Sequence, residues 1–127
     1  MDDGKLIMVV EDDLTIRQLI AEILRDAGHE VMECASGEDA LSRLESTRPS
    51  VITLDLAMPS MDGVEFLRLL RERSGAPEAA IVVVTAAPEY LRYELAEKGH
   101  WILAKPFHVD QLLATVERAL DQQRAAA

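Results

Sequence analysis

Cysteine, basic side chains and long apolar runs are all scarce in this sequence of 127 residues. The single cysteine, Cys34, excludes an internal disulfide and is most simply a small residue of the core. Only 13 Lys and Arg stand against 23 Asp and Glu, which gives a formal net charge of −10. Because phosphate contacts need clustered basic side chains, we expect no direct binding to nucleic acid.

Signals for membranes and for export are absent as well. No apolar run approaches the roughly 20 residues that a helix needs to cross a bilayer. The opening residues, M-D-D-G-K, lack the basic and apolar regions of a signal peptide. We therefore expect a cytoplasmic protein that does not enter a membrane.

The sequence does contain enough apolar residues for one folded domain. Hydrophobic residues make up 49% of the chain and charged residues 28%, a balance typical of globular proteins. The length suits a single hydrophobic core. We predict one domain over residues 1–122, followed by a C-terminal tail or the start of a linker at residues 123–127.

Short apolar runs alternate with segments of helical period along the whole chain. The predicted strands are residues 6–10, 29–35, 51–54, 80–84 and 101–104, and the predicted helices are residues 14–27, 38–48, 64–73, 89–98 and 109–120. Asp13 is a suitable N-cap for the first helix, while Gly28 and Gly99 are suited to end helices. Strands that are apolar on both faces predict an α/β fold, in which helices cover a parallel sheet on both sides.

The predicted strand at residues 51–54 ends on a carboxylate, Asp55. A turn follows, with Pro59 and then Asp62-Gly63, before the helical pattern begins at Val64. Open α/β sheets bind their ligands at the carboxyl ends of their strands, so Asp55 is a candidate for chemistry. Taken alone, it is better explained as an ordinary turn residue, and the other polar groups of the chain raise its candidacy.

Four other polar side chains follow predicted strands: Glu11 and Asp12, Thr85, and Lys105. Because right-handed crossovers bring the carboxyl ends of parallel strands to one edge, these groups should meet Asp55 there. Each has a simpler explanation by itself, as a helix N-terminus, a strand-forming residue or a loop dipeptide. Their joint occurrence at the ends of separate strands is harder to explain by chance, so it indicates a functional site.

Three carboxylates at one edge repel each other, and a hard cation such as Mg²⁺, with Mn²⁺ as an alternative, would relieve that repulsion. In this interpretation Asp12 is a direct ligand and Glu11 acts through water. Asp55 could then attack phosphorus and form an acyl phosphate, with Lys105 and Thr85 binding the phosphoryl oxygens or Lys105 pairing with Asp55.

Four motifs in order give the chain a resemblance to a known family: V-V-E-D-D, D-L-A-M-P-S-M-D-G-V-E, V-V-V-T-A and K-P-F. From about Lys5 to Leu120 the sequence resembles a receiver domain of the two-component response regulators. The resemblance implies a flavodoxin-like fold of five βα units, a doubly wound parallel sheet with strand order 2-1-3-4-5.

The resemblance also implies a role for each residue at the sheet edge. Asp55 would be the phosphoacceptor, and Glu11 and Asp12 the acidic pair. A backbone carbonyl of Ala57 would complete the metal ligands together with Asp12 and Asp55. The residues implied to bind the phosphoryl group are Thr85, Ala86 and Lys105, and the bond between Lys105 and Pro106 would be cis.

The implied partners are a donor and an output. The donor would be a sensor histidine kinase or a histidine phosphotransfer protein, and the output a separate protein or an attached effector domain. The domain would assist its own phosphorylation and dephosphorylation without being an enzyme for a separate substrate. It would act as a monomer or as a phosphorylation-dependent dimer through the face formed by the fourth helix, the fifth strand and the fifth helix.

One part of the sequence departs from the family pattern. Receivers usually have Tyr or Phe three residues before the lysine, where this chain has Ile102, and the segment between Gly99 and Lys105 is one residue shorter than usual. In the usual switch the threonine, here Thr85, moves toward the phosphoryl group and the aromatic residue turns inward. We expect either that Trp101 takes over this role or that it is an ordinary strand residue.

Three other functions fit parts of the pattern. A phosphohydrolase of the haloacid dehalogenase type also uses an aspartate after a strand, but it needs a second Asp where this chain has Ala57. A flavodoxin-type cofactor binder needs a phosphate loop where the chain has Glu11, Asp12 and Asp13. A receiver that docks without being phosphorylated is the third alternative.

Overall fold

The computed structural model describes residues 6–56, 63–72, 79–86, 89–97 and 99–126. Strands and helices alternate through this part of the chain, as the sequence predicts. The strands are β1 (Leu6–Val10), β2 (Glu30–Cys34), β3 (Val51–Asp55), β4 (Ala80–Thr85) and β5 (Trp101–Ala104). The helices are α1 (Leu14–Asp26), α2 (Gly37–Arg43), α3 (Gly63–Glu72), α4 (Glu89–Glu97) and α5 (Val109–Ala126).

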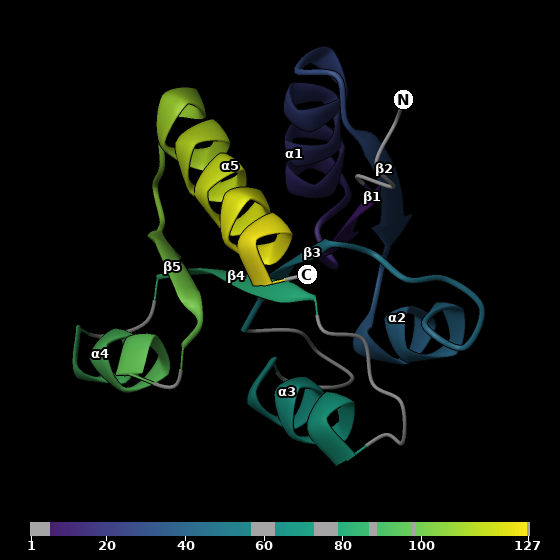
Figure 1. Cartoon of the computed structure of the whole chain (residues 1–127), viewed down its shortest axis with the longest axis vertical. Coiled ribbons are helices and arrows are strands. Elements are labelled where there is room, and N and C mark those ends of the chain that lie inside the picture. Colours follow the sequence, from purple (N-terminus) through teal and green to yellow (C-terminus); the bar gives the residue numbers. More distant parts are fainter. Residues whose placement is uncertain (1–5, 57–62, 73–78, 87–88, 98, 127) are drawn as a thin grey trace.

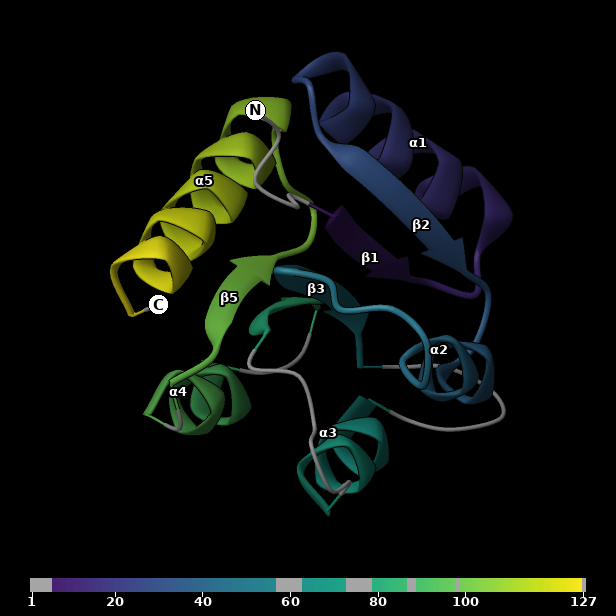
Figure 2. The ribbon, with the colours of Figure 1, turned by 45° about the vertical axis from the view of Figure 1, so that its right-hand side comes forward.

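The five strands form one parallel sheet in the order β2-β1-β3-β4-β5, which confirms the predicted fold. Helices α1 and α5 cover one face, and α2, α3 and α4 lie on the other (Figure 1). Figure 2 shows β2 at one edge of the sheet beside α1, and β5 at the opposite edge between α4 and α5. The connections lead from β1 to β2 on one side and then to β3 on the other, so the switch point of the sheet lies between β1 and β3. Such sheets bind ligands at the switch point.

Alternate residues of each strand pack into two separate cores. In β4, for example, Val82 and Val84 pack with α1 and α5, whereas Ile81 and Val83 pack with α2, α3 and α4. The period-2 geometry of a strand divides its side chains in this way. A central strand with helices on both sides therefore has no polar face, which explains the continuous apolar runs in the sequence.

Helix ends follow local chemistry that the sequence indicates. The side chain of Asp13 caps α1 by accepting a hydrogen bond of 3.0 Å from the backbone N–H of Ile16. Gly28 and Gly99 follow α1 and α4 with φ angles of +96° and +91°, a region that an L side chain rarely adopts. These residues end their helices where the sequence predicts.

Two predicted helix ends are wrong. Helix α2 ends at Arg43, five residues before the predicted end at residue 48. Beyond Arg43 the backbone N–H groups of Glu45 and Ser46 donate to carbonyls three residues back instead of four, at 3.3 and 3.1 Å, so the chain tightens into turns there. Helix α5 continues to Ala126 instead of ending at residue 120.

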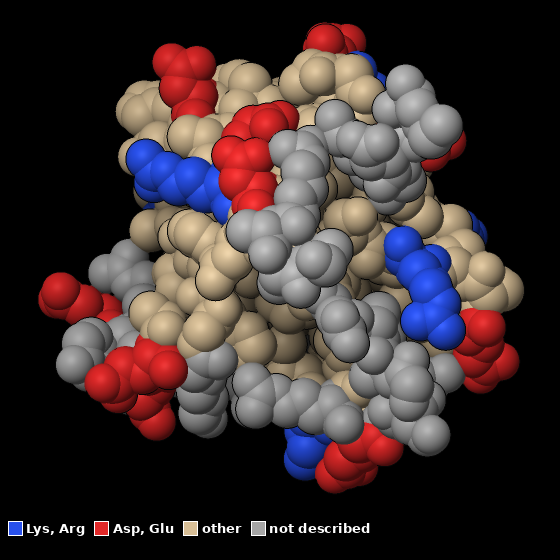
Figure 3. Space-filling view, in the orientation of Figure 1, with Lys and Arg blue, Asp and Glu red and all other residues tan. Residues whose placement is uncertain are grey.

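On the face seen in Figure 3, the acidic side chains of the described residues stand in separate groups, and single Lys or Arg side chains lie beside them. Within the described part of the chain, no helix combines the length and the apolar character that a membrane span requires.

The two leucines Leu112 and Leu19 offer a matched test of this packing. Leu112 of α5 is fully buried, whereas Leu19 of α1 is 49% exposed. We expect Leu112→Ala to lower the free energy of unfolding by about 2–5 kcal/mol, because it leaves a cavity. Leu19→Ala should cost less than about 0.5 kcal/mol, since it buries little area. Urea unfolding followed by circular dichroism measures both free energies. Equal losses would contradict the burial of Leu112 in the core.

Candidate functional site

Three carboxylates meet at the carboxyl edge of the sheet. Glu11 and Asp12 follow β1, Asp55 ends β3, and one oxygen from each lies within 4.8 Å of the others. The two strands are neighbours, and Val10 pairs with Leu54, so the residues that follow are at the same level. Glu11 is 2% exposed and Asp55 8%, whereas Asp12 is exposed to solvent. The structure thus brings together the three acids that the sequence singles out.

Lys105 supplies a positive charge at the same edge. Its Nζ lies 3.5 Å from Oδ2 of Asp55 and 3.7 Å from Oε1 of Glu11. Its backbone N–H donates to the carbonyl of Thr85 at 2.8 Å, which keeps the ends of β5 and β4 level. The bond between Lys105 and Pro106 is cis, as expected. The predicted pairing of Lys105 with Asp55 is confirmed, and the contact with Glu11 is an addition to it.

Thr85 and Ala86 lie beside this cluster at the end of β4. Thr85 is the last residue of the strand and is 4% exposed, while Ala86 is exposed to solvent. Asp55 pairs with Val84 in the register of β3 and β4, so Thr85 is one residue beyond the level of Asp55. Ala57, the predicted donor of a backbone carbonyl, lies outside the described residues.

Burial and crowding perturb the acid that is deepest in the site. Burial is the main cause that raises the pKa of Glu11 to about 7, and the charge of Asp55 raises it further. The backbone N–H of Asp13, which donates to Oε2 of Glu11 at 3.1 Å, and the charge of Lys105 lower the pKa. The effects of burial and of Asp55 thus outweigh those of the Asp13 N–H and of Lys105 at Glu11.

This arrangement fits a hard divalent cation. Mg²⁺ prefers carboxylate and carbonyl oxygens together with water, and the cluster provides three carboxylates, of which Asp12 is open to solvent. A cation would favour the ionised form of Glu11 and relieve the repulsion between the acids. The residues present are therefore suited to Mg²⁺.

Arg17 belongs to the site, although the sequence analysis did not single it out. Its Nη1 donates to the backbone carbonyl of Glu11 at 2.8 Å, and its Nε lies 3.4 Å from Oε1 of Glu33 in β2. The available signal was weak: an arginine four residues after the N-cap Asp13, beside the apolar stripe of α1. The contact of Arg17 with Glu33 forms only because the fold packs α1 against β2.

Trp101 and Ile102 lie on opposite faces of the sheet. Trp101 begins β5, pairs with Val82 and packs with the core on the side of α1 and α5. Ile102 pairs with Val83 and packs with the core on the side of α2, α3 and α4. Thr85 has the same parity in β4 as Val83, so the period of the strand puts it on the face of Ile102.

A hollow runs along the open edge of β2, away from the acidic cluster. It has a volume of about 680 Å³ and is lined in part by Arg25, His29 and Arg43. Arg25 already binds Glu33, and Arg43 binds Asp39 at 3.1 Å. His29 forms a 2.9 Å contact with Glu117. The basic groups of this hollow are therefore engaged within the protein.

Comparisons with known proteins agree with this geometry. The family model described as the response regulator receiver domain matches residues 7–117. The DNA-binding response regulator MtrA of Mycobacterium tuberculosis is 34% identical over 116 residues, which are 90% of this chain and 50% of MtrA. The chain thus spans about half the length of the MtrA proteins that it matches.

Two chemotaxis proteins match over nearly their full length. The protein CheY of Listeria monocytogenes is 29% identical over 116 residues, covering 89% of this chain and 96% of CheY. The crystallised CheY4 of Vibrio cholerae superimposes with a TM-score of 0.81 at 34% identity, covering 91% of this chain and 98% of that one.

Proposed function

The chain belongs to the receiver domain family of the two-component response regulators, and on that basis we propose that Asp55 accepts the phosphoryl group in a phosphorelay. Receiver domains are phosphoacceptor signalling domains and are not enzymes in the usual sense. The observation that carries the proposal is the position of Asp55, which shares a cluster with two other carboxylates and the ammonium group of Lys105. Membership of this family removes the phosphohydrolase and cofactor-binding alternatives.

The proposed chemistry is phosphoryl transfer from a phosphohistidine. A carboxylate oxygen of Asp55 attacks the phosphorus, the new O–P bond forms, and the P–N bond to the imidazole breaks. The imidazole nitrogen leaves with the electron pair and takes a proton from solvent. Lys105, the hydroxyl of Thr85 and the backbone N–H of Ala86 then bind the phosphoryl oxygens.

We assign Mg²⁺, with Mn²⁺ as a substitute, to the acidic cluster. Asp12 and Asp55 would bind it directly, with the backbone carbonyl of Ala57, and Glu11 would bind through water. When bound, the cation neutralises negative charge on the transferred group. Lys105 brings one positive charge to two carboxylates, so the positive charge of the cation is also needed before an anionic phosphoryl group can enter.

Response regulators act with histidine kinases and output effectors. For this chain we propose a sensor histidine kinase or a histidine phosphotransfer protein as the donor, in the cytoplasm. The output would be a separate protein or an attached effector domain, reached through the face of α4, β5 and α5, as a monomer or as a phosphorylation-dependent dimer.

The first prediction tests the phosphoacceptor. Incubation with acetyl phosphate and Mg²⁺ should add one phosphoryl group to the protein, seen as a mass increase of about 80 Da, and Asp55→Asn should remain unmodified because an amide is not a nucleophile here. Chelation of Mg²⁺ should also prevent the reaction. Modification of Asp55→Asn at the wild-type level would exclude Asp55 as the acceptor. Absence of modification in the wild type would favour the receiver that docks without phosphorylation.

The second prediction separates the two members of the acidic pair. Asp12→Ala should abolish measurable Mg²⁺ binding, because Asp12 is proposed as a direct ligand. Glu11→Ala should weaken binding by about tenfold, as expected for a group that acts through water. Calorimetric titration with MgCl₂ measures both. Asp26→Ala, which removes an exposed carboxylate at the far end of α1, is the matched control, and equal losses in the first two variants would contradict the assignment.

We also propose a switch that involves Thr85, Ile102 and Trp101. Ile102 packs on the α4 side of β5 and Trp101 on the α5 side, so a movement of β5 changes the packing of both. Ile102 has no ring and no hydroxyl, so its rearrangement should bias the equilibrium by only about 1–2 kcal/mol.

The third prediction uses Trp101 as a probe of that movement, since it is the only tryptophan. Its emission should change on addition of beryllofluoride and Mg²⁺, because a half-buried indole responds to repacking of β5 against α5. The change should be absent in Asp55→Asn and smaller in Thr85→Ala. An unchanged spectrum at saturating beryllofluoride would exclude Trp101 from the switch.

A further inference from the structure

Arg17 links the acidic pair to the neighbouring helix and strand. We propose that it is a positioning residue that fixes the backbone between Glu11 and Asp12, so that Asp12 presents its carboxylate to a divalent cation. This inference rests on the proposed function of the acidic cluster. It concerns a contact that lies outside the cluster itself, on the side of α1 and β2.

Besides its ion pair with Lys105, Glu11 is held by three hydrogen bonds. Its backbone N–H donates to the carbonyl of Cys34 at 3.1 Å, and its side chain accepts from the N–H of Asp13. The third contact is the hydrogen bond of 2.8 Å from Arg17 to its backbone carbonyl. The side chain of Arg17 is only 14% exposed, so water competes poorly for that carbonyl.

The carbonyl that Arg17 binds belongs to the peptide bond between Glu11 and Asp12. Because a peptide unit is planar, holding this oxygen fixes the orientation of the whole unit and the position of the Asp12 Cα. Asp12 is exposed and lies within 4.8 Å of two other carboxylates, which repel it. A restrained backbone keeps it at the cluster despite that repulsion.

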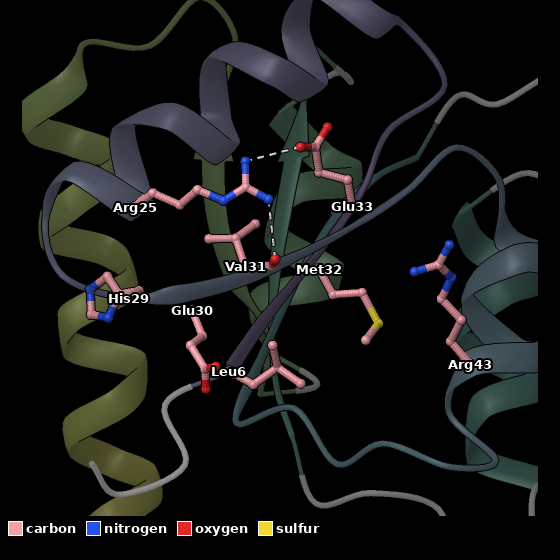
Figure 4. Close-up of a pocket in the computed structure, with 8 residues that line it drawn as sticks. All are labelled: Leu6, Arg25, His29, Glu30, Val31, Met32, Glu33 and Arg43. Carbon is pink, nitrogen blue, oxygen red and sulfur yellow. Dashed lines mark hydrogen bonds and ion pairs between the residues drawn. The ribbon is translucent and has the colours of Figure 1, made fainter. Parts of the chain in front are cut away.

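Glu33 orients the guanidinium from the opposite side. Its Oε1 lies 3.4 Å from Nε of Arg17, and its Oε2 lies 3.1 Å from Nη1 of Arg25. Arg25 also donates to the carbonyl of Val31 at 3.2 Å, as Figure 4 shows. Both arginines therefore connect α1 to β2 through one carboxylate, but only Arg17 contacts the acidic pair.

Simple electrostatics predicts the opposite effect from positioning, which makes the inference testable. Removing a positive charge near an acidic cluster should strengthen the binding of a cation. Loss of a group that orients a metal ligand typically weakens binding by about 10–100-fold. The sign of the change in Mg²⁺ affinity therefore distinguishes the two effects.

The experiment compares Arg17→Met with Arg25→Met in the full chain. Each variant loses one arginine bound to Glu33 and keeps an apolar stem. Calorimetric titration with MgCl₂ should give a Kd about tenfold higher for Arg17→Met, and a Kd equal to or below the wild-type value for Arg25→Met. Arg17→Lys, which retains charge but not the planar fork, should fall between Arg17→Met and the wild type. Amide resonances of Asp12 and Asp13 should shift in the Arg17 variants without Mg²⁺.

Thermal melting without Mg²⁺ controls for a general loss of structure. If Arg17 only ties α1 to β2, both Met variants should lose Mg²⁺ affinity in proportion to their loss of Tm, and that result would overturn the inference. Unchanged or tighter binding in Arg17→Met would also overturn it. If Arg17→Met does not fold, Arg17→Lys decides by the same comparison. A wild type that binds no Mg²⁺ would overturn the metal site itself and, with it, the role of Arg17.

Discussion

Repulsion between carboxylates at one edge of the sheet is the constraint on which the site depends. Parallel strands deliver Glu11, Asp12 and Asp55 to the same place, and two of the three are almost fully buried. Lys105 compensates part of this charge, and burial, with a smaller contribution from the charge of Asp55, raises the pKa of Glu11. In the proposed function, the cluster accommodates a cation and then a phosphoryl group.

The rest of the fold holds this unfavourable cluster in place. Continuous apolar strands, covered by helices on both faces, provide a hydrophobic core on each side of the sheet. The ends of β4 and β5 are kept level by the hydrogen bond between Lys105 and Thr85. In the proposed switch, a change in charge at Asp55 would act on Lys105 and, through this hydrogen bond, on the ends of both strands. Strand β5 carries Ile102 and Trp101 on opposite faces.

On the other side of the cluster, α1 and β2 restrain the acidic pair through contacts of a different kind. These contacts come from Arg17, which Glu33 orients, and from the backbone N–H of Asp13, the N-cap of α1. On the side of α1, Arg17 holds the backbone of the acidic pair. On the side of β4 and β5, the site has Thr85 and Lys105. In the function proposed above, the first would serve cation binding and the second the response to phosphorylation.

The sequence alone determined the alternation of strands and helices, the polar residues that end the strands, and the cap at Asp13. These features are local, because they follow from hydrophobic period and from hydrogen bonds between near neighbours. It did not determine the end of α2, where hydrogen bonds to the third residue back replace the helical pattern. Nor did it indicate that Arg17 meets Glu33 and the carbonyl of Glu11, or that Trp101 packs toward α5 and Ile102 toward α4. Only the tertiary structure decided these points, since they depend on which helix covers which face of the sheet.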